Sequence, residues 1–338
     1  MHQEIMAIGG YGETDKENVF VYQAEDKDCW KLLDSIQAGK NPSYLCFGTQ
    51  DILYVVNERN QPMHQTSGLV KTFSLPKPGL PMQELGSISS FGDDPCFLTL
   101  DPQKKFLLAT NYSSGTVVIY SLTESGIPDR VVQLLQFSGS GPHPTRQLVS
   151  HPHSILFDKE GTSLYVADLG TDQLHHIAWN PEEILPCTPM ENIAMPSGSG
   201  PRLIRFSPDG KSLYVVNELA NTVSFLEKES EAISHTFSTL ENPVSGATAA
   251  HMELYKEAII VSNRKANTLW VHTSIQDTWH ACSGDGPRFF ALEKNRLFLA
   301  YQNSDLITTC NLQEDFSLSK EKELLKVPKP TCIQFSSH

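Results

Sequence analysis

Imidazole, guanidinium and carboxylate side chains follow short apolar segments at widely separated points of this 338-residue chain. Among them, the residues best suited to catalysis are His153, Arg202, Glu218 and Arg264. A histidine or a glutamate can act as a general base toward water. Guanidinium groups can stabilise an oxyanion or bind a carboxylate or phosphate. Because these residues are far apart in sequence, they form one site only if the fold brings several segment ends together.

The apolar segments belong to a repeat. Each copy has a proline or glycine, an alternating apolar run, a polar turn and a second apolar run. The copies begin at Pro42, Pro95, Pro152, Pro201, Gly246, Pro287 and Pro330, between 41 and 57 residues apart. This period is typical of four-stranded propeller blades, and runs of this length rich in β-branched and aromatic residues favour strands over helices. The pattern predicts an all-β fold, a seven-bladed β-propeller with four-stranded blades, as one domain over residues 1–338.

The two chain ends are expected to share one blade. The copy that begins at Pro330 stops after one strand, and the N-terminus supplies two strand-like runs, at 4–8 and 18–22. N-terminal strands that join the C-terminal strand would close the ring and remove its open sheet edges. Short loops that end in Gly161 and Gly210 suit hairpins between the first two strands of their blades.

The same topology predicts where polar residues meet. In a propeller the first strand of each blade lines the channel and the second returns antiparallel beside it. The start of the first strand and the end of the second therefore lie at one mouth. The polar residues expected there are Ser43, Asn57, Glu58, Asp94, Asn111, Tyr112, His151, His153, Asp168, Arg202, Asn217, Glu218, Thr248, Asn263, Arg264, Arg288, Gln302 and Asn303. Strand ends that converge on one cavity are typical of a functional site.

A sequence insertion should lie over this mouth. The segment Ser-Gly-Ser-Gly-Pro occurs at 138–142 and again at 197–201, but only the first copy is followed by an extra segment, 143–150, before its strand. This segment could be a rim or lid that carries His143 and Arg146. It could equally be an inert surface loop.

Composition excludes several classes of protein. The formal net charge of −13 disfavours a nucleic-acid or anionic-membrane partner, which would need clustered lysine and arginine. An anionic small substrate remains possible if local cations outweigh the global charge. Seven cysteines without a CxxC pair indicate small buried residues in a reducing compartment. The start of the chain does not resemble a signal peptide, and no segment is long and apolar enough for a membrane span, so we expect a cytoplasmic protein.

The sequence gives no sign of a cofactor. His151 and His153 could share a face, but two ligands without a clear third make a metal site a weak hypothesis, and we predict none. The sequence has no GxSxG motif, P-loop or dinucleotide fingerprint, which disfavours covalent serine catalysis and nucleotide cofactors.

Several motifs together resemble the seven-bladed β-propeller lactonase family, which includes 6-phosphogluconolactonases and carboxymuconate-lactonizing enzymes. The resemblance covers nearly the whole chain. Its most specific motifs are Gly139-Ser-Gly-Pro with Arg146-Gln, His151-Pro-His153-Ser with Asp168-Leu-Gly, Gly200-Pro-Arg202 with Val216-Asn-Glu218, Ser262-Asn-Arg264, and Ala300-Tyr-Gln302. One departure is the glycine at 246, where the other copies of the repeat begin with proline, which makes the start of blade five the least certain.

The resemblance implies an enzyme that hydrolyses a sugar lactone, 6-phosphogluconolactone to 6-phosphogluconate, without a cofactor. It implies His153, Arg202, Glu218 and Arg264 as catalytic residues. The residues that we expect to bind substrate are Asn111, Arg146, Asp168, Asn217, Asn263 and Gln302. The implied partner is a small anionic sugar lactone, with the protein a monomer or weak homodimer.

Lactone hydrolysis needs an activated water and stabilisation of the carbonyl oxygen. Glu218 or His153 could be the base, with Arg202 and Arg264 as substrate clamp and oxyanion support. Structural alternatives stay open: His153 could cap a strand, and Arg202 could pair with Glu218 inside a blade. Glu58 occupies the place equivalent to Glu218 in blade one, so this glutamate could be a blade-building residue. Two alternative functions stay open: cycloisomerisation of a carboxylated muconate, and a non-enzymatic role as an interaction scaffold.

Overall fold

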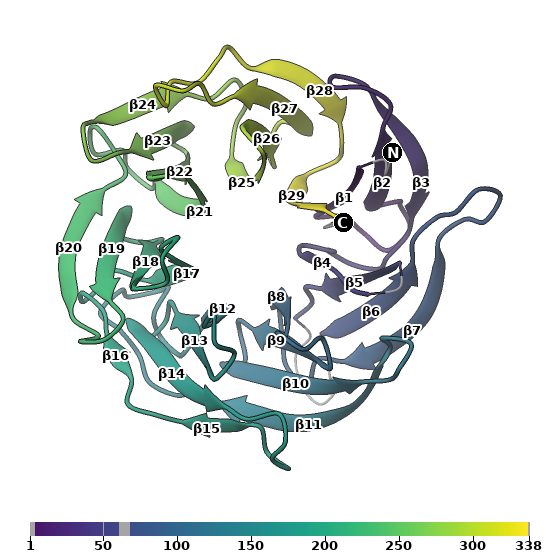
Figure 1. Cartoon of the computed structure of the whole chain (residues 1–338), viewed down its shortest axis with the longest axis horizontal. Helices are drawn as coiled ribbons and strands as arrows, with labels where there is room; N and C mark the ends of the chain where they lie inside the picture. Colours follow the sequence, from purple (N-terminus) through teal and green to yellow (C-terminus); the bar gives the residue numbers. More distant parts are fainter. Residues whose placement is uncertain (1–3, 50, 61–67, 337–338) are drawn as a thin grey trace.

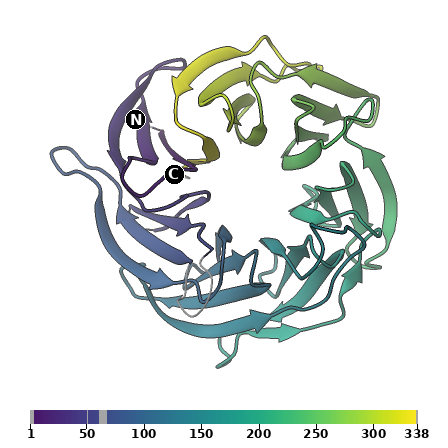
Figure 2. The same cartoon turned by 180° about the vertical axis from the view of Figure 1, so that it is seen from behind.

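The computed structural model describes residues 4–49, 51–60 and 68–336. All the secondary-structure elements named in these ranges are β-strands. The strands form seven sheets arranged as a ring (Figure 1). The sequence-based prediction of a seven-bladed β-propeller is confirmed. Figure 2 shows the same ring from behind. Second strands such as β5 (Ile52–Asn57) and β13 (Ser163–Asp168) are buried along their whole length, because each sheet packs between two neighbours.

Each blade runs from an innermost strand on the channel to an outer edge strand. Blade one contains β4 (Leu45–Phe47), β5, β6 (Leu69–Ser74) and β7 (Gln83–Ser89). Blade two contains β8 (Pro95–Leu100), β9 (Phe106–Asn111), β10 (Thr116–Leu122) and β11 (Pro128–Gln136). Blade three contains β12 (Pro152–Phe157), β13, β14 (Gln173–Trp179) and β15 (Cys187–Pro189), with β16 (Ile193–Ala194) also paired to β14.

The remaining blades follow the same order. Blade four contains β17 (Pro201–Phe206), β18 (Ser212–Asn217), β19 (Thr222–Glu227) and β20 (Ile233–Ser238). Blade five contains β21 (Thr248–Tyr255), β22 (Ala258–Arg264), β23 (Thr268–His272) and β24 (Asp277–Ala281). Blade six contains β25 (Pro287–Glu293), β26 (Arg296–Tyr301), β27 (Leu306–Asn311) and β28 (Lys322–Lys326).

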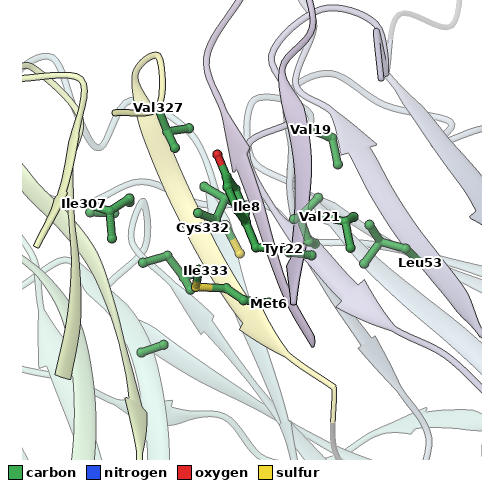
Figure 3. Packing of buried hydrophobic residues seen from close by; sticks show 14 of the residues in the cluster. Met6, Ile8, Val19, Val21, Tyr22, Leu53, Ile307, Val327, Cys332 and Ile333 are labelled. Atoms are coloured by element: carbon green, nitrogen blue, oxygen red, sulfur yellow. The ribbon is translucent and has the colours of Figure 1, made fainter. Parts of the chain in front are cut away.

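Blade seven joins the two ends of the chain. The C-terminal strand β29 (Pro330–Phe335) is innermost, followed by β1 (Ile5–Gly10), β2 (Val19–Ala24) and β3 (Trp30–Ile36). Ile8 lies opposite Ile333 in the antiparallel pairing of β1 with β29. Figure 3 shows Met6 and Ile8 beside Cys332 and Ile333 within the buried cluster that seals this junction. The predicted closure is confirmed.

A β-bulge recurs at the start of the innermost strands. In blades two, three, four and six the pairing with the second strand shifts register one residue after the initial proline. The shift leaves one residue of each strand outside the ladder: Cys96, His153, Arg202 and Arg288. Because a bulge redirects the side chain of its extra residue, these four side chains line the channel instead of packing in the sheet.

Blade five begins irregularly, as its glycine start suggested. Thr248 pairs with Arg264 and Ala249 with Asn263, but the register then shifts before Met252 pairs with Val261. The predicted second strand of this blade is present and ends at Arg264.

Two loops have the expected turn geometry. The N–H of Gly161 donates to the carbonyl of Asp158, and that of Gly210 to the carbonyl of Ser207. Both glycines have φ near +70°, at +68° and +76°, a backbone conformation that residues with a Cβ rarely adopt. All seven cysteines are free thiols. Within the ranges described, no helix is long and apolar enough to cross a membrane.

Candidate active site

Glu218 lies at the centre of a charged cluster directly after β18, and it is only 1% exposed. Its Oε1 is 2.7 Å from Nη2 of Arg146, and its Oε2 is 2.6 Å from Nη1 of Arg202. Nη2 of Arg264 lies 3.0 Å from the same Oε2. Burial alone would raise the pKa of Glu218, but the three guanidinium groups hold it well below its ordinary value. The carboxylate is therefore ionised across the physiological range.

Arg202 connects this carboxylate to the imidazole of His153. Its Nη1 contacts both Oε2 of Glu218 and Nε2 of His153, while its Nε donates to the carbonyl of Ala250 at 2.7 Å. Burial, and then the charge of Arg202, lower the pKa of His153 well below its ordinary value. His153 is thus a neutral ring with Nε2 as a hydrogen-bond acceptor. The ion pair of Arg202 with Glu218 is present, and it forms part of this shared cluster.

Arg264 is the guanidinium with unused donors. Its Nη2 is close enough to Glu218 for an ion pair, but the geometry does not make a hydrogen bond, and the buried Nε and Nη2 have no hydrogen-bond acceptor among the described residues. Burial, together with the charges of Arg202 and Arg288, lowers the pKa of Arg264 to about 10 despite the opposing effect of Glu218. Its N–H groups are available to a ligand.

The inserted segment 143–150 forms a rim that contributes Arg146. The Arg146 side chain is 39% exposed, and its Nη2 also donates to the hydroxyl of Tyr112 at 3.2 Å. The next residue, Gln147, is fully buried, and its Nε2 donates to the carbonyl of Leu169 and to Oδ1 of Asp172. His143 accepts the backbone N–H of Arg146 at Nδ1 and so stabilises the turn. Of the two alternatives for this segment, the structure has the rim with Arg146.

A small cavity lies among the channel residues of all seven blades. Its volume is approximately 30 Å³, enough for a water molecule and too small for a sugar. Its polar lining includes His153, Arg202, His251 and Arg288. Aromatic rings also line it: the ring of Tyr44 lies 4.5 Å from that of Phe97. A sugar-sized ligand must therefore bind at the mouth, with this cavity beside it.

Four of the residues expected to bind substrate point into the blades instead: Asn111, Asp168, Asn217 and Asn263. All are fully buried. The amide nitrogen of Asn111 donates to the carbonyl of Ser90, that of Asn217 to Oγ of Ser224, and that of Asn263 to the carbonyl of Thr239. Asp168 accepts hydrogen bonds from Ser150, the backbone of His151 and Gly170, and the ring of His175.

These four side chains hold loops and neighbouring strands together, because each ends a second strand where unpaired backbone groups need partners. The structure does not bring them into the Glu218 cluster, and we do not assign them to substrate. Gln302 is partly buried, and its backbone N–H donates to the carbonyl of Gly286. Its contact with substrate stays a prediction.

Three further residues join the surroundings of the site. Arg288 lines the cavity with His153 and Arg202. Its position directly after the initial proline, which His153 and Arg202 share, predicted Arg288 at this mouth, although not among the catalytic or substrate-binding residues. Tyr112 stacks on His151 with ring centroids 4.3 Å apart and lies edge-on to His153. Tyr11 directly follows β1, the second strand of blade seven, and this strand end, equivalent to that of Glu218, was the signal that could have selected it. Among the residues that the structure describes, no three histidine, cysteine, aspartate or glutamate side chains are grouped to hold a metal ion.

The family described as "Lactonase, 7-bladed beta-propeller" matches residues 5–335 of the chain. The chain belongs to this family. The lactonase is 26% identical to 6-phosphogluconolactonase of Bacillus subtilis over 356 aligned residues, which cover 99% of each chain. The family and these relatives support the assignment of the protein as a lactonase enzyme.

Solved structures agree with this assignment. The lactonase is similar to periplasmic gluconolactonase of Pseudomonas aeruginosa, with a TM-score of 0.89, 26% identity and 99% of each chain covered. Virginiamycin B lyase of Staphylococcus aureus, with a TM-score of 0.57, 12% identity and 82% of each chain covered, shares the fold alone. The cytoplasmic location and the monomeric or weakly dimeric state of this lactonase stay predictions.

Proposed function

We propose that this lactonase hydrolyses the lactone of an anionic sugar acid, 6-phosphogluconolactone, to 6-phosphogluconate. The observation that supports this most directly is the charge of the site. Three guanidinium groups share the single carboxylate of Glu218, which leaves an excess of positive charge at the mouth of a protein with a net charge of −13. Such a local excess attracts an anion and disfavours a cationic ligand.

Of the two candidate bases, His153 is the better choice. Glu218 pairs with three guanidinium groups, and protonation would weaken all three contacts at once. His153 is neutral and lies beside the water-sized cavity, where a water molecule can replace Arg202 as the hydrogen-bond donor to Nε2. We assign Glu218 to hold the arginines in place, and His153 to accept a proton from water.

The reaction then follows from the positions of these groups. Water attacks the lactone carbonyl carbon while one of its protons passes to Nε2 of His153. The carbonyl oxygen becomes an oxyanion, and the guanidinium of Arg264, whose side chain is 20% exposed, stabilises it. When the bond from the carbonyl carbon to the ring oxygen breaks, the ring oxygen takes the proton from His153. Arg146, the most exposed of the three arginines, binds the charged end of the substrate at the rim.

The names of relatives leave the phosphate open, since one is called a 6-phosphogluconolactonase and another a gluconolactonase. The excess positive charge supports the phosphorylated substrate. No specific observation favours the cycloisomerisation of a carboxylated muconate, so that reaction belongs in the substrate panel as an alternative outcome.

Hydrolysis should be followed by NMR on freshly prepared 6-phosphogluconolactone, on gluconolactone and on a carboxymuconate. We expect acceleration over spontaneous hydrolysis, with kcat/KM higher for the phosphorylated lactone, and a loss of about 100-fold in Arg264→Ala. Arg130→Ala, at an exposed arginine on the outer strand β11, is the matched control and should be unchanged. A wild-type protein that accelerates neither lactone would refute the proposal.

A further inference from the structure

A second polar group faces the channel away from Glu218, at the junction of blades six, seven and one. The hydroxyl of Tyr11 donates to Oε1 of Glu58 at 2.7 Å. The guanidinium carbon of Arg288 lies over the Tyr11 ring, 4.8 Å from its centroid. Arg288 also lines the small cavity together with His153 and Arg202. Arg288 therefore connects this group to the cavity that His153 also lines.

This group has unused hydrogen-bonding capacity. The Oε2 of Glu58 is buried and has no hydrogen-bond partner, and in the described part of the chain the Arg288 guanidinium has no hydrogen bond or ion pair. A buried acceptor without a partner is costly unless a ligand satisfies it, and the partly buried Arg288 guanidinium can donate to the same ligand. The charges of nearby groups also act on the pKa of Arg288. Burial would lower this pKa, but the charges of Tyr11, Glu58 and Glu218 raise it above the ordinary value.

The group is also held rigidly before any ligand binds. The backbone N–H of Glu58 donates to the carbonyl of Asn41, and the Asn41 side chain in turn accepts the N–H of Gly12, next to Tyr11. The N–H of Tyr11 donates to the carbonyl of Lys329. Loops from both ends of the chain thus fix the phenol and the carboxylate relative to each other, as a preorganised binding site requires.

The charge of this side differs from that of the Glu218 cluster. Glu58 and Arg288 are of opposite sign and cancel, so an anion gains little there, and the free carboxylate oxygen repels it. A carboxylate acceptor next to guanidinium donors instead matches hydroxyl groups, which donate to the first and accept from the second. Adjacent hydroxyls on a sugar ring present this pair of functions together.

We propose that Tyr11, Glu58 and Arg288 form a hydroxyl-recognition subsite, which selects polyhydroxylated lactones and directs their anionic end toward Arg146. This inference rests on the proposed function. The group determines which lactone binds and in which orientation, and His153 and Arg264 act on the carbonyl.

The test compares a hydroxylated and an unhydroxylated lactone. We expect Glu58→Gln to lower kcat/KM for 6-phosphogluconolactone at least tenfold, mainly through KM, because a site built to bind hydroxyls discriminates strongly by them. Hydrolysis of δ-valerolactone, which has no ring hydroxyls, should stay within twofold. Tyr11→Phe, a milder variant, should change the same ratio in the same direction. Glu257→Gln, at an exposed glutamate in the β21–β22 turn, is the control. Equal losses on both lactones, or no loss, overturn the subsite.

A binding measurement separates this inference from the proposed hydrolysis. By calorimetry, wild type should bind gluconate at least tenfold more tightly than 5-hydroxyvalerate, the product of δ-valerolactone, and Glu58→Gln should remove most of this preference. If the protein shows this preference but hydrolyses no lactone, the subsite stands and the proposed reaction is refuted. If the protein hydrolyses 6-phosphogluconolactone but shows no preference for gluconate, the reaction stands and the subsite is refuted.

Discussion

Blades one and four contain the same six residues, Leu-Tyr-Val-Val-Asn-Glu, at 53–58 and 213–218, yet the two glutamates have different surroundings. Glu218 pairs with three arginines. Among the residues that the structure describes, Oε1 of Glu58 accepts a hydrogen bond from Tyr11, and its Oε2 has no hydrogen-bond partner. An identical local sequence thus produces one strongly cationic environment and one nearly neutral environment.

The difference comes from residues that other blades supply. Arg146 lies on the insertion before blade three, and Arg264 ends the second strand of blade five. Tyr11 follows β1, the second strand of blade seven. The shared hexapeptide therefore determines where each glutamate lies, at the mouth after a buried strand, and the neighbours determine what it can do. In our proposals one copy holds the catalytic arginines and the other binds substrate hydroxyls.

The largest expected difference between the copies is catalytic. Glu218→Gln should lower kcat/KM on 6-phosphogluconolactone by about 100- to 1,000-fold, because the arginines lose the anion that positions them. It should also lower the free energy of unfolding by about 3–5 kcal/mol, as removal of one partner from a buried ion pair typically does. Glu58→Gln should keep most of the stability and lose activity mainly through KM. Kinetics and urea unfolding on both variants make the comparison, and similar losses in both would remove the distinction.

Much of this arrangement could be predicted from the sequence, because the repeat determines which residues lie at the mouth. His153 and Arg202 follow the initial proline, and Glu218 and Arg264 lie at the end of a second strand. Asn111, Asn217 and Asn263 occupy strand-end positions as well, and nothing in their type shows that they turn into the blade. That orientation depends on which backbone groups of neighbouring loops lack partners, which only the assembled ring reveals.

The insertion and the closing blade show the same limit. The sequence left Arg146 either on a rim or on an inert loop, and the buried contacts of Gln147 decide between them. Tyr11 approaches Glu58 only because the chain ends meet in one sheet. Contacts that depend on ring closure join residues distant in sequence, and no local pattern encodes them.

The next effect should separate function from stability on the Glu218 side. Arg264→Met should lower kcat/KM about 100-fold, yet raise the free energy of unfolding by up to about 3 kcal/mol, because the fold disfavours the charge of Arg264. Inorganic phosphate should raise the Tm of wild type more than that of the variant, since the anion binds the excess cations. Thermal unfolding with and without phosphate measures both effects. A variant that is less stable than wild type would contradict the assignment of Arg264 as an under-compensated cation.

Acidic pH should also act on the Glu218 side, through His153. The pKa of this ring is lower in the folded protein than the value of about 6.5 in the unfolded chain, so below pH 6.5 only the unfolded chain gains the proton. Stability should therefore fall between pH 6.5 and 5 by up to about 1.4 kcal/mol per pH unit for this residue.

The pKa of Glu218 is also lowered, but its contribution is lost only at pH values below its unfolded pKa, near 4.3, and so lies outside this window. His251, with its pKa lowered to about 4, adds a similar slope of its own. Urea unfolding of wild type and His153→Gln at pH 7, 6 and 5 should show a shallower dependence in the variant. Parallel curves would mean that His153 is not held neutral by Arg202.

The smallest effect concerns the asparagine that the two hexapeptides share. The amide nitrogen of Asn57 donates to the carbonyl of Ala38 at 2.9 Å, and that of Asn217 to Oγ of Ser224 at 2.9 Å, both inside their blades. Asn57→Ala should lower the free energy of unfolding by about 1 kcal/mol, the usual loss for one such hydrogen bond. Asn217→Ala should lower it by about 2 kcal/mol, because the amide nitrogen of Asn217 also donates to Oγ1 of Thr222. Neither should change KM for the lactone, because neither side chain reaches the mouth. A rise in KM confined to Asn217→Ala would return this residue to the substrate-binding role that the sequence first suggested, and the two copies would then differ at two positions instead of one.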